Sequence, residues 1–180
     1  MNKIIAFGAS SSKNSINKKL ASFVANKISH QGAVTLDLND FEMPIYSEDR
    51  HAEDGVPKKA LEFNNIINES KGLVISLAEH NGSYTSAFKN IYDWISVIEK
   101  TVWSNKPILL MSTSDGARGG KSVLETALPR FSRQSNFEIP HFILPSFYEN
   151  FSEELGIINQ KLNTELDKKI SEFKKQVNTT

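Results

Sequence analysis

Residues 3–17 read KIIAFGASSSKNSIN, a run of strand-forming residues that stops at a glycine and continues into small polar residues. From Asn17 onward apolar residues recur at helical spacing, and Gly32 stands where a glycine often ends a helix. A strand, a polar loop and a helix in this order form the opening of a βαβ unit. This stretch therefore predicts a parallel sheet whose strands are joined by helical crossovers.

The same alternation continues along the rest of the chain. Further runs of β-forming residues lie at 33–38, 72–77, 106–112 and 141–144. Helical patterns lie at 57–70, 86–98 and 122–134, and a long amphipathic helix is predicted from Leu155 to Phe173. The polar segment 39–57 is expected to be a connection without a helix of its own. Five strands alternating with five helices predict an α/β fold with a parallel sheet between two layers of helices.

The composition narrows the classes of function. A chain of 180 residues with 39% hydrophobic residues fits one globular domain, spanning 1–180. Lys+Arg and Asp+Glu both total 21 and form no long block of like charge, so we expect no nucleic-acid partner. No apolar run approaches a membrane-spanning length, which predicts a cytoplasmic protein without membrane contact. Without cysteines, redox chemistry would need a bound cofactor.

Three polar loops, at 9–17, 78–85 and 112–121, follow predicted strands. The carboxyl ends of parallel strands share one edge of a sheet, and ligands bind at that edge. The first loop opens a helix, so its N–H groups and hydroxyls suit a phosphate, although one of these residues could simply cap the helix. Walker A and dinucleotide glycine patterns are absent from this loop, which favours a mononucleotide. The expected contacts are Ser10, Ser12, Ser15, Ile16 and Asn17, the last of which is expected to donate through its side-chain amide.

The second loop, AEHNGSY at 78–84, places an acid beside a base. Glu79 and His80 would have to reach one proton to act as a catalytic pair, but adjacent residues at a strand end usually point to opposite sides. We therefore do not expect these two side chains to form a catalytic pair. Backbone amides of this loop are expected to meet the polar edge of a flat heterocycle. The expected contacts are Glu79, His80, Asn81, Gly82 and Ser83.

The third loop, STSDGARGGKS at 112–122, ends like a Walker A motif, but Asp115 stands where the first glycine is required. A nucleoside triphosphate is therefore not expected. Its glycines predict a mobile loop that lets a second ligand approach closely, and a surface turn without function is the alternative. The expected contacts are Thr113, Ser114, Gly116 and Gly119.

Two other features were candidates for function. His30, His51 and His141 are not spaced with another histidine or a carboxylate in the manner of metal ligands, so no metal site is predicted. The helix at 86–98 carries two partly apolar faces. The second face could be part of the core or could form a subunit interface, and both interpretations stay open at this point.

Together, GASSSKNSINKKLA, EHNGSYTSAFKNIYDWIS and KPILLMSTSDGARGG resemble the NADPH-dependent FMN reductase family of flavodoxin-like proteins. In that family the first loop reads approximately G-S-x-R-x-x-S-x-N and holds the FMN phosphate. Ser10, Ser15 and Asn17 match its serines and asparagine. Ser12 stands at the arginine position, which predicts weaker FMN binding than in relatives that keep the arginine.

The second family motif, usually P-E-Y-N-x-S, lies along the flavin ring. Glu79, Asn81 and Ser83 match it, whereas Ala78 replaces the proline and His80 replaces the tyrosine. The third, glycine-rich motif borders the flavin and matches residues 112–120.

The resemblance implies a three-layer α/β/α sandwich with a five-stranded parallel sheet in the order 2-1-3-4-5. It also implies FMN as the cofactor, NADPH or NADH as the hydride donor, and a flavin, quinone or similar acceptor reached by a ping-pong route. Because the cofactor would carry the chemistry, the resemblance implies no catalytic side chain. A homodimer or tetramer is expected, with the helix at 86–98 as the contact. A flavodoxin-like electron carrier and an FMN-binding regulatory module are the alternative functions.

Overall fold

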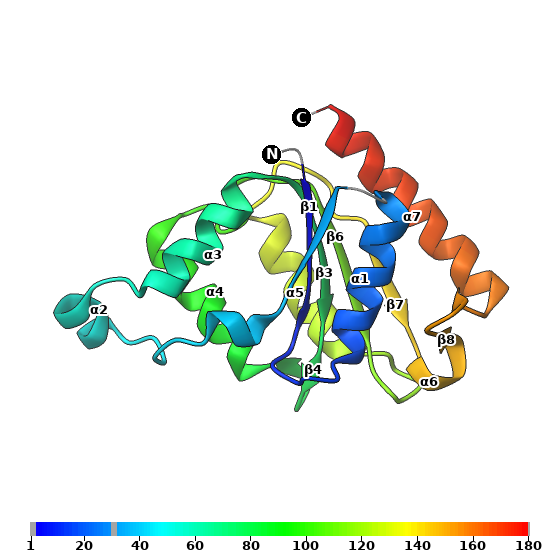
Figure 1. Ribbon diagram of the computed structural model, residues 1–180, viewed down its shortest axis with the longest axis horizontal. Helices are drawn as coiled ribbons and strands as arrows, with labels where there is room; N and C mark the ends of the chain where they lie inside the picture. The colour runs from blue at the N-terminus through cyan, green and yellow to red at the C-terminus, as the bar shows by residue number, and fades with distance from the viewer. Residues whose placement is uncertain (1–2, 30–31, 180) are drawn as a thin grey trace.

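The computed structural model describes residues 3–29 and 32–179. Five parallel strands form one sheet with helices on both faces (Figure 1). In spatial order the strands are β2 (Ala33–Leu36), β1 (Lys3–Ala9), β3 (Ser70–Leu77), β6 (Ile108–Thr113) and β7 (His141–Leu144). Counted within this sheet alone, the order is 2-1-3-4-5. The predicted architecture and strand order are therefore confirmed.

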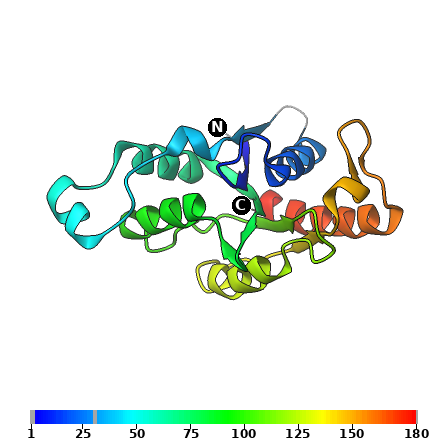
Figure 2. The same cartoon turned by 90° about the horizontal axis from the view of Figure 1, so that it is seen from below.

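The central strands are buried over almost their whole length because helices cover both of their faces. One layer consists of α1 (Ile16–Ile28) and α7 (Gln160–Asn178). The other consists of α3 (Lys58–Asn68), α4 (Ser86–Ile98) and α5 (Lys121–Ser132), as Figure 2 shows. A hydrophobic core lies between each layer and the sheet. This arrangement brings the carboxyl ends of β1, β3 and β6 to the lower edge of the sheet in Figure 1.

The end of β1 lies in direct contact with the start of α1. A Cβ atom added at Gly8 would overlap the backbone nitrogen of Lys18 and come within 2.6 Å of the Asn17 carbonyl carbon. Those atoms belong to a helix backbone, which cannot rotate away as a side chain can. Glycine at position 8 therefore lets the first turn of α1 lie against the edge of the sheet.

Helix α1 ends earlier than predicted. Its last residue is Ile28, and Ser29 adopts an extended conformation whose N–H still bonds to the Ala25 carbonyl. The Ser29 hydroxyl accepts a hydrogen bond from the N–H of Gly32 at 3.0 Å. The serine thus ends the helix, and the predicted role of Gly32 as the helix-ending glycine is wrong.

The polar segment 39–57 contains helical structure that was not predicted. It begins within a 3-10 helix, η1 (Leu38–Phe41), and contains α2 (Glu48–Asp54). Ser47 caps the N-terminus of α2 by accepting from the N–H of Arg50, and Gly55 ends it with a positive φ of 73°. None of the α2 residues is buried, and the helix lies at the far end of the molecule (Figure 1). Local capping therefore accounts for a helix that has no apolar periodicity.

The closing helix begins later than predicted. Leu155 is 73% exposed, and Gly156 has a positive φ of 74°, which interrupts any helix there. The chain instead forms the short helix α6 (Phe147–Asn150) and a hairpin of β8 (Phe151–Ser152) and β9 (Gly156–Ile157). Helix α7 then starts after Asn159, whose side chain accepts from the N–H of Leu162. A left-handed glycine and a new cap thus override the apolar spacing.

The second apolar face of α4 is covered by the protein's own chain. Trp94 is 1% exposed, and its indole N–H donates to the Pro44 carbonyl at 2.7 Å. The Tyr46 ring packs edge-on against it with centroids 5.0 Å apart. Of the two interpretations left open by the sequence, core packing accounts for this face.

The Gly8 contact predicts a specific loss of stability. Gly8→Ala should lower the free energy of unfolding by at least about 2 kcal/mol, because one of two backbone segments must move. Gly116→Ala is the matched control, since a Cβ there would meet only the Ser114 hydroxyl oxygen at 3.9 Å. Urea unfolding of both variants measures the difference. Equal stability of the two variants would show that β1 and α1 are not in this contact.

Candidate functional site

A polar cavity of about 290 Å³ lies at the edge of the sheet where β1, β3 and β6 end. Four segments line it: 10–17, 78–80, 113–115 and the side chain of Tyr148. The three predicted loops therefore do converge on one site. The predicted residues that the structure brings together in its wall are Ser10, Ser12, Ser15, Ile16, Asn17, Glu79, His80, Thr113 and Ser114.

The first turn of α1 offers free hydrogen-bond donors to this cavity. The Ser15 hydroxyl caps the helix by accepting from the N–H of Lys18 at 3.1 Å, so the capping interpretation holds for this serine. The N–H groups of Ile16 and Asn17 have no acceptor within the described residues. Free N–H groups at a helix N-terminus, together with the helix dipole, favour an anion such as a phosphate.

The serine hydroxyls of this loop can donate to a ligand, and one of them also shapes the loop. The Ser10 oxygen accepts from the N–H of Ser12 at 3.1 Å, which shapes the turn. Ser10 is buried and Ser12 is exposed. Because an accepting hydroxyl still carries its own proton, both side chains can donate to a ligand in the cavity.

The side chain of Asn17 forms hydrogen bonds within the protein. It is 3% exposed, and its amide nitrogen donates to the Thr113 carbonyl at 3.1 Å. Its carbonyl oxygen accepts from the Thr113 N–H at 3.1 Å and from the Ser76 hydroxyl at 2.7 Å. The amide thus joins α1 to β3 and β6, and donation to a ligand from its second N–H stays a prediction. The backbone N–H of Asn17 remains open to the cavity.

Glu79 is held by a helix rather than by its histidine neighbour. Its carboxylate accepts from the N–H of Val123 in the first turn of α5 at 2.9 Å. The positive end of the helix dipole also stabilises a carboxylate in this position. His80 follows on the exposed side of the strand. This geometry supports the prediction that Glu79 and His80 do not act as an acid/base pair.

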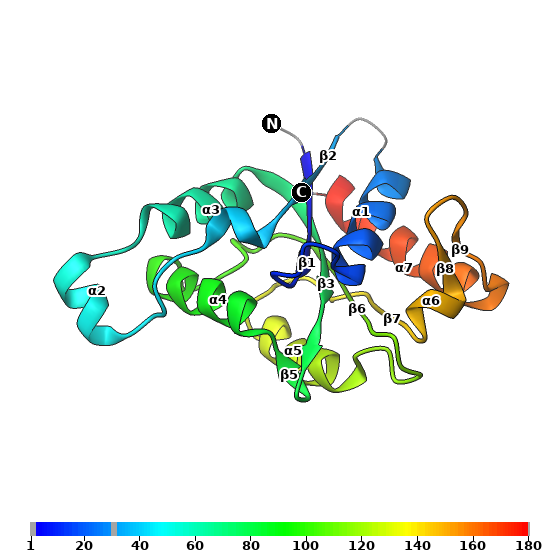
Figure 3. The ribbon, with the colours of Figure 1, turned by 60° about the horizontal axis from the view of Figure 1, so that its bottom comes forward.

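The rest of the second loop is a β-hairpin, which was not predicted. Strands β4 (Glu79–His80) and β5 (Ser83–Tyr84) pair across Asn81 and Gly82, whose φ angles are 51° and 78°. Two central residues with positive φ are the mark of a type I′ turn, and Asn-Gly is its strongest sequence signal. The hairpin projects beside α5 (Figure 3). Its tip is exposed and does not line the cavity, so contacts from Asn81, Gly82 and Ser83 stay a prediction.

Hydrogen bonds hold the third loop to the end of β7 and to the start of α6. The Thr113 hydroxyl donates to the Leu144 carbonyl at 2.7 Å, and the Ser114 carbonyl accepts from the N–H of Phe147 at 2.9 Å. Gly119 is buried with a φ of 59°, and a Cβ there would come within 2.5 Å of the Ile143 side chain. The close approach at Gly119 is thus to β7 rather than to a ligand. The interpretation as a mobile loop is wrong for this glycine, and Gly116 is exposed outside the cavity lining.

Several residues of the cavity wall were not predicted. Tyr148, 73% exposed, stands at the mouth of the cavity just after the end of β7. The rule that all parallel strands end at one edge applies to this fifth strand too, and it would have pointed to this tyrosine. The remaining residues that the prediction omitted are Asn14, Ala78 and Asp115.

Other kinds of site were also considered. Across 3–29 and 32–179 there is no group of three or more His, Asp or Glu side chains placed to hold a metal ion. None of the helices in the same two stretches is long and apolar enough to cross a membrane. His30 lies outside the described residues.

The hydrogen bonds of Asn17 predict a pH-dependent effect. Asn17→Asp should lower the free energy of unfolding by at least about 2 kcal/mol near neutral pH, because an ionised carboxylate cannot donate to the Thr113 carbonyl. Burial raises the pKa of such a carboxyl, so the deficit should fade as the pH falls toward its ordinary value of about 3.9 and the carboxyl binds a proton. Urea unfolding from pH 7 to pH 4 measures both effects.

Ser76→Ala is the matched control, since it removes one donor to the same oxygen and no charge is buried. It should cost about 1 kcal/mol with no such dependence on pH. An Asn17→Asp protein as stable as the Ser76→Ala protein at pH 7 would contradict the role given to the amide nitrogen.

The family model for NADPH-dependent FMN reductases matches residues 2–149 of the chain. The chain is 32% identical over 79 residues to a quinone reductase of Escherichia coli, a match that covers 44% of this chain and 42% of that protein. It is 34% identical over 112 residues to a quinone reductase of Pseudomonas putida, covering 60% and 58%. The matched segments thus span about half the length of these relatives.

The fold is similar to that of FerB, a flavoenzyme NAD(P)H:(acceptor) oxidoreductase from Paracoccus denitrificans. The TM-score is 0.76 at 20% identity, and the match covers 99% of this chain and 98% of FerB. The fold is therefore flavodoxin-like, and the ordered loops of the site agree with the matched family model. The chain belongs to the NADPH-dependent FMN reductase family.

Proposed function

We propose that this protein takes hydride from NADPH or NADH onto bound FMN and passes the electrons to a quinone, a free flavin or a similar acceptor. Family membership and the similarity to two quinone reductases support this proposal. The observation that carries it is the pair of free N–H groups at Ile16 and Asn17 in the wall of the polar cavity. They offer an anion site where a mononucleotide phosphate fits.

In this proposal the chain binds and orients the cofactor, which supplies the hydride and electron transfer chemistry when bound. The phosphate is held by the N–H groups of Ile16 and Asn17 and by hydroxyls of Ser10, Ser12 and Ser15. Donation from five uncharged groups and a helix dipole replaces the arginine that the family has at position 12.

The ring of the cofactor is assigned to the part of the cavity between segments 78–80 and 113–115. Thr113 and Ser114 form one wall, and Ala78, Glu79 and His80 form the other. Backbone N–H groups of the hairpin are proposed to face the polar edge of the ring, where fixed donors favour negative charge. Gly119 is left out of the cofactor contacts because it packs against β7.

A ping-pong route is part of the proposal, since nicotinamide and acceptor would use the opening between the same two segments in turn. We also propose that one domain, 1–180, carries the activity in the cytoplasm, and the absence of cysteines agrees with a reducing compartment. A homodimer or tetramer is retained from the family resemblance. With Trp94 covered, the exposed side chains of Ile45 and Val97 are the apolar surface left near α4.

The proposed function is tested first on the purified protein. We expect a flavin absorption spectrum after loading with FMN, and oxidation of NADPH or NADH when a quinone or free flavin is supplied. FMN binding without nicotinamide oxidation would favour the electron carrier or the regulatory module. A protein that neither binds FMN nor oxidises either nicotinamide would contradict the proposal.

A matched pair of variants tests the anion site directly. Ile16→Pro removes one free N–H at the first helical position, where proline is tolerated, and Ser15 already has the extended ψ of 115° that a following proline favours. Ile16→Ala removes the same side chain and keeps the N–H. The proline variant should bind FMN roughly tenfold more weakly than the alanine variant. Equal affinities in a fluorescence titration would exclude this N–H from the site.

A further inference from the structure

The hydroxyl group of Tyr148 is open to a ligand at the mouth of the polar cavity. The side chain is 73% exposed and lines the cavity together with the first turn of α1. Its hydroxyl forms no hydrogen bond to any residue in 3–29 or 32–179. A phenol hydroxyl can donate one hydrogen bond, and here that donor is not used by the protein itself.

Hydrogen bonds fix the backbone next to Tyr148 to the third loop. The N–H of Ser146 donates to the Gly116 carbonyl at 3.0 Å, and the N–H of Phe147 donates to the Ser114 carbonyl at 2.9 Å. The tyrosine therefore has a fixed attachment point beside the segment that lines the cavity after β6.

Tyr148 and the segment 78–80 lie at different ends of the polar cavity. Tyr148 follows β7 and the segment 78–80 follows β3, and β6 lies between these two strands in the sheet. Phe147 is part of the core on the α1 face of the sheet, whereas the Glu79 carboxylate bonds to the first turn of α5 on the other face. Tyr148 therefore belongs to the end of the cavity next to α1, away from the part assigned to the flavin ring.

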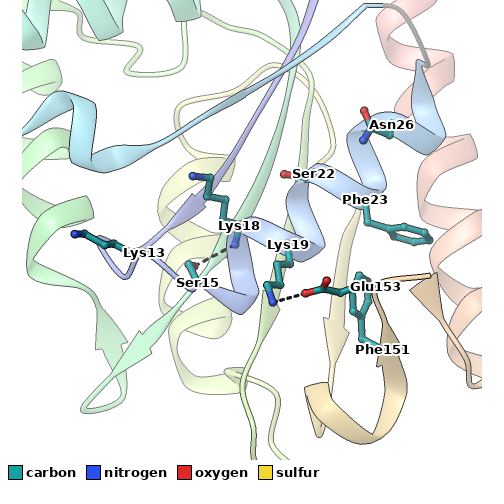
Figure 4. Close-up of a pocket in the computed structure, with 9 residues that line it drawn as sticks. All are labelled: Lys13, Ser15, Lys18, Lys19, Ser22, Phe23, Asn26, Phe151 and Glu153. Carbon is teal, nitrogen blue, oxygen red and sulfur yellow. Dashed lines mark hydrogen bonds and ion pairs between the residues drawn. The ribbon is translucent and has the colours of Figure 1, made fainter. Parts of the chain in front are cut away.

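The chain that follows Tyr148 is held against α1. Figure 4 shows two side chains of α1 pointing toward this segment. The Lys19 ammonium group lies 2.5 Å from the Glu153 carboxylate. The rings of Phe23 and Phe151 pack edge to face with centroids 5.5 Å apart. These contacts keep α6 and its tyrosine beside α1.

The Tyr148 oxygen lies within electrostatic reach of the start of α1. The pKa of Lys19 is raised, first by its hydrogen bond and Coulombic attraction to Glu153 and further by the phenol of Tyr148. The same end of α1 carries the N–H groups of Ile16 and Asn17, which have no acceptor within the described residues. The tyrosine hydroxyl and these two N–H groups thus share one end of the cavity.

Ser146 keeps the segment before Tyr148 in an uncommon conformation. Its φ of 44° and ψ of 63° are left-handed, which is unfavourable for a residue with a side chain. Hydrogen bonds compensate, because the Ser146 carbonyl accepts from the N–H of Asn150 at 3.1 Å and the Asn150 amide donates to the Pro145 carbonyl at 2.9 Å. The Tyr148 ring then meets the Phe147 ring edge-on with centroids 5.5 Å apart. A side chain supported in this way loses less freedom when it binds a ligand.

We propose that the Tyr148 hydroxyl donates a hydrogen bond to the phosphate of FMN, across from the N–H groups of Ile16 and Asn17. The phosphate is then bound from two elements, by the backbone of α1 and by a side chain of α6. Hydrogen bonds to a charged acceptor are stronger than neutral ones, so the contact favours FMN over riboflavin, which lacks the phosphate. This inference rests on the phosphate position in the proposed function.

Titration of the flavin-free protein with FMN and with riboflavin, followed by flavin fluorescence, tests the contact. Tyr148→Phe keeps the exposed ring and removes only the hydroxyl. It should weaken FMN binding by about threefold to tenfold and leave riboflavin binding unchanged. Tyr46→Phe is the matched control, because the Tyr46 ring packs on Trp94 outside the polar cavity, and it should change neither affinity. Thermal unfolding verifies that both variants are folded.

Phosphorus NMR of the FMN-loaded protein gives a second readout that does not depend on affinity. The resonance of the bound phosphate should move in Tyr148→Phe and should stay in place in Tyr46→Phe. This measurement decides the contact in a protein that binds riboflavin too weakly for titration.

An unchanged FMN affinity or an unchanged phosphorus resonance in Tyr148→Phe would overturn the inference. Equal weakening of FMN and riboflavin binding would also overturn it, because the hydroxyl would then contact a part that both flavins share. A protein that binds FMN but oxidises neither nicotinamide contradicts the proposed function, and the two variants still decide the role of Tyr148. A protein that binds no FMN contradicts both.

Discussion

The candidate site depends on the hydrogen bonds of one buried amide, the side chain of Asn17. It bonds to the backbone of Thr113 in both directions and accepts from the Ser76 hydroxyl, so α1, β3 and β6 meet at a single group. A buried amide that loses a partner pays a desolvation cost, which disfavours other placements of these elements. The first turn of α1 is thereby held at the edge of the sheet with its free N–H groups toward the cavity.

Polar residues of the three loops divide into those that build the site and those left open to a ligand. Ser15 and Glu79 cap helices, and Thr113 ties its loop to the end of β7. Ser12 and His80 are exposed at the cavity. The site thus offers backbone donors and hydroxyls rather than an acid/base pair, which suits a protein whose chemistry resides in a cofactor.

The sheet and its three loops were predictable because buried parallel strands produce continuous apolar runs, and their ends share one edge. The hydrogen-bond partners of the Asn17 side chain were not predictable, since they lie 59 and 96 residues away and no periodic pattern links them. The packing of Gly119 on β7 is long-range in the same way. The Asn81–Gly82 turn, by contrast, had a local sequence signal for a hairpin but was interpreted as a loop. The positive φ of Gly156 prevents a helix there, so α7 begins later than its apolar spacing predicts.

The most direct test of this account is a crystal structure of the protein with FMN bound. We expect phosphate oxygens within hydrogen-bond distance of the N–H groups of Ile16 and Asn17, while the Asn17 side chain keeps its bonds to Ser76 and Thr113. An Asn17 amide that leaves the Thr113 carbonyl and donates to the phosphate instead would contradict the central claim that this side chain joins α1 to β3 and β6.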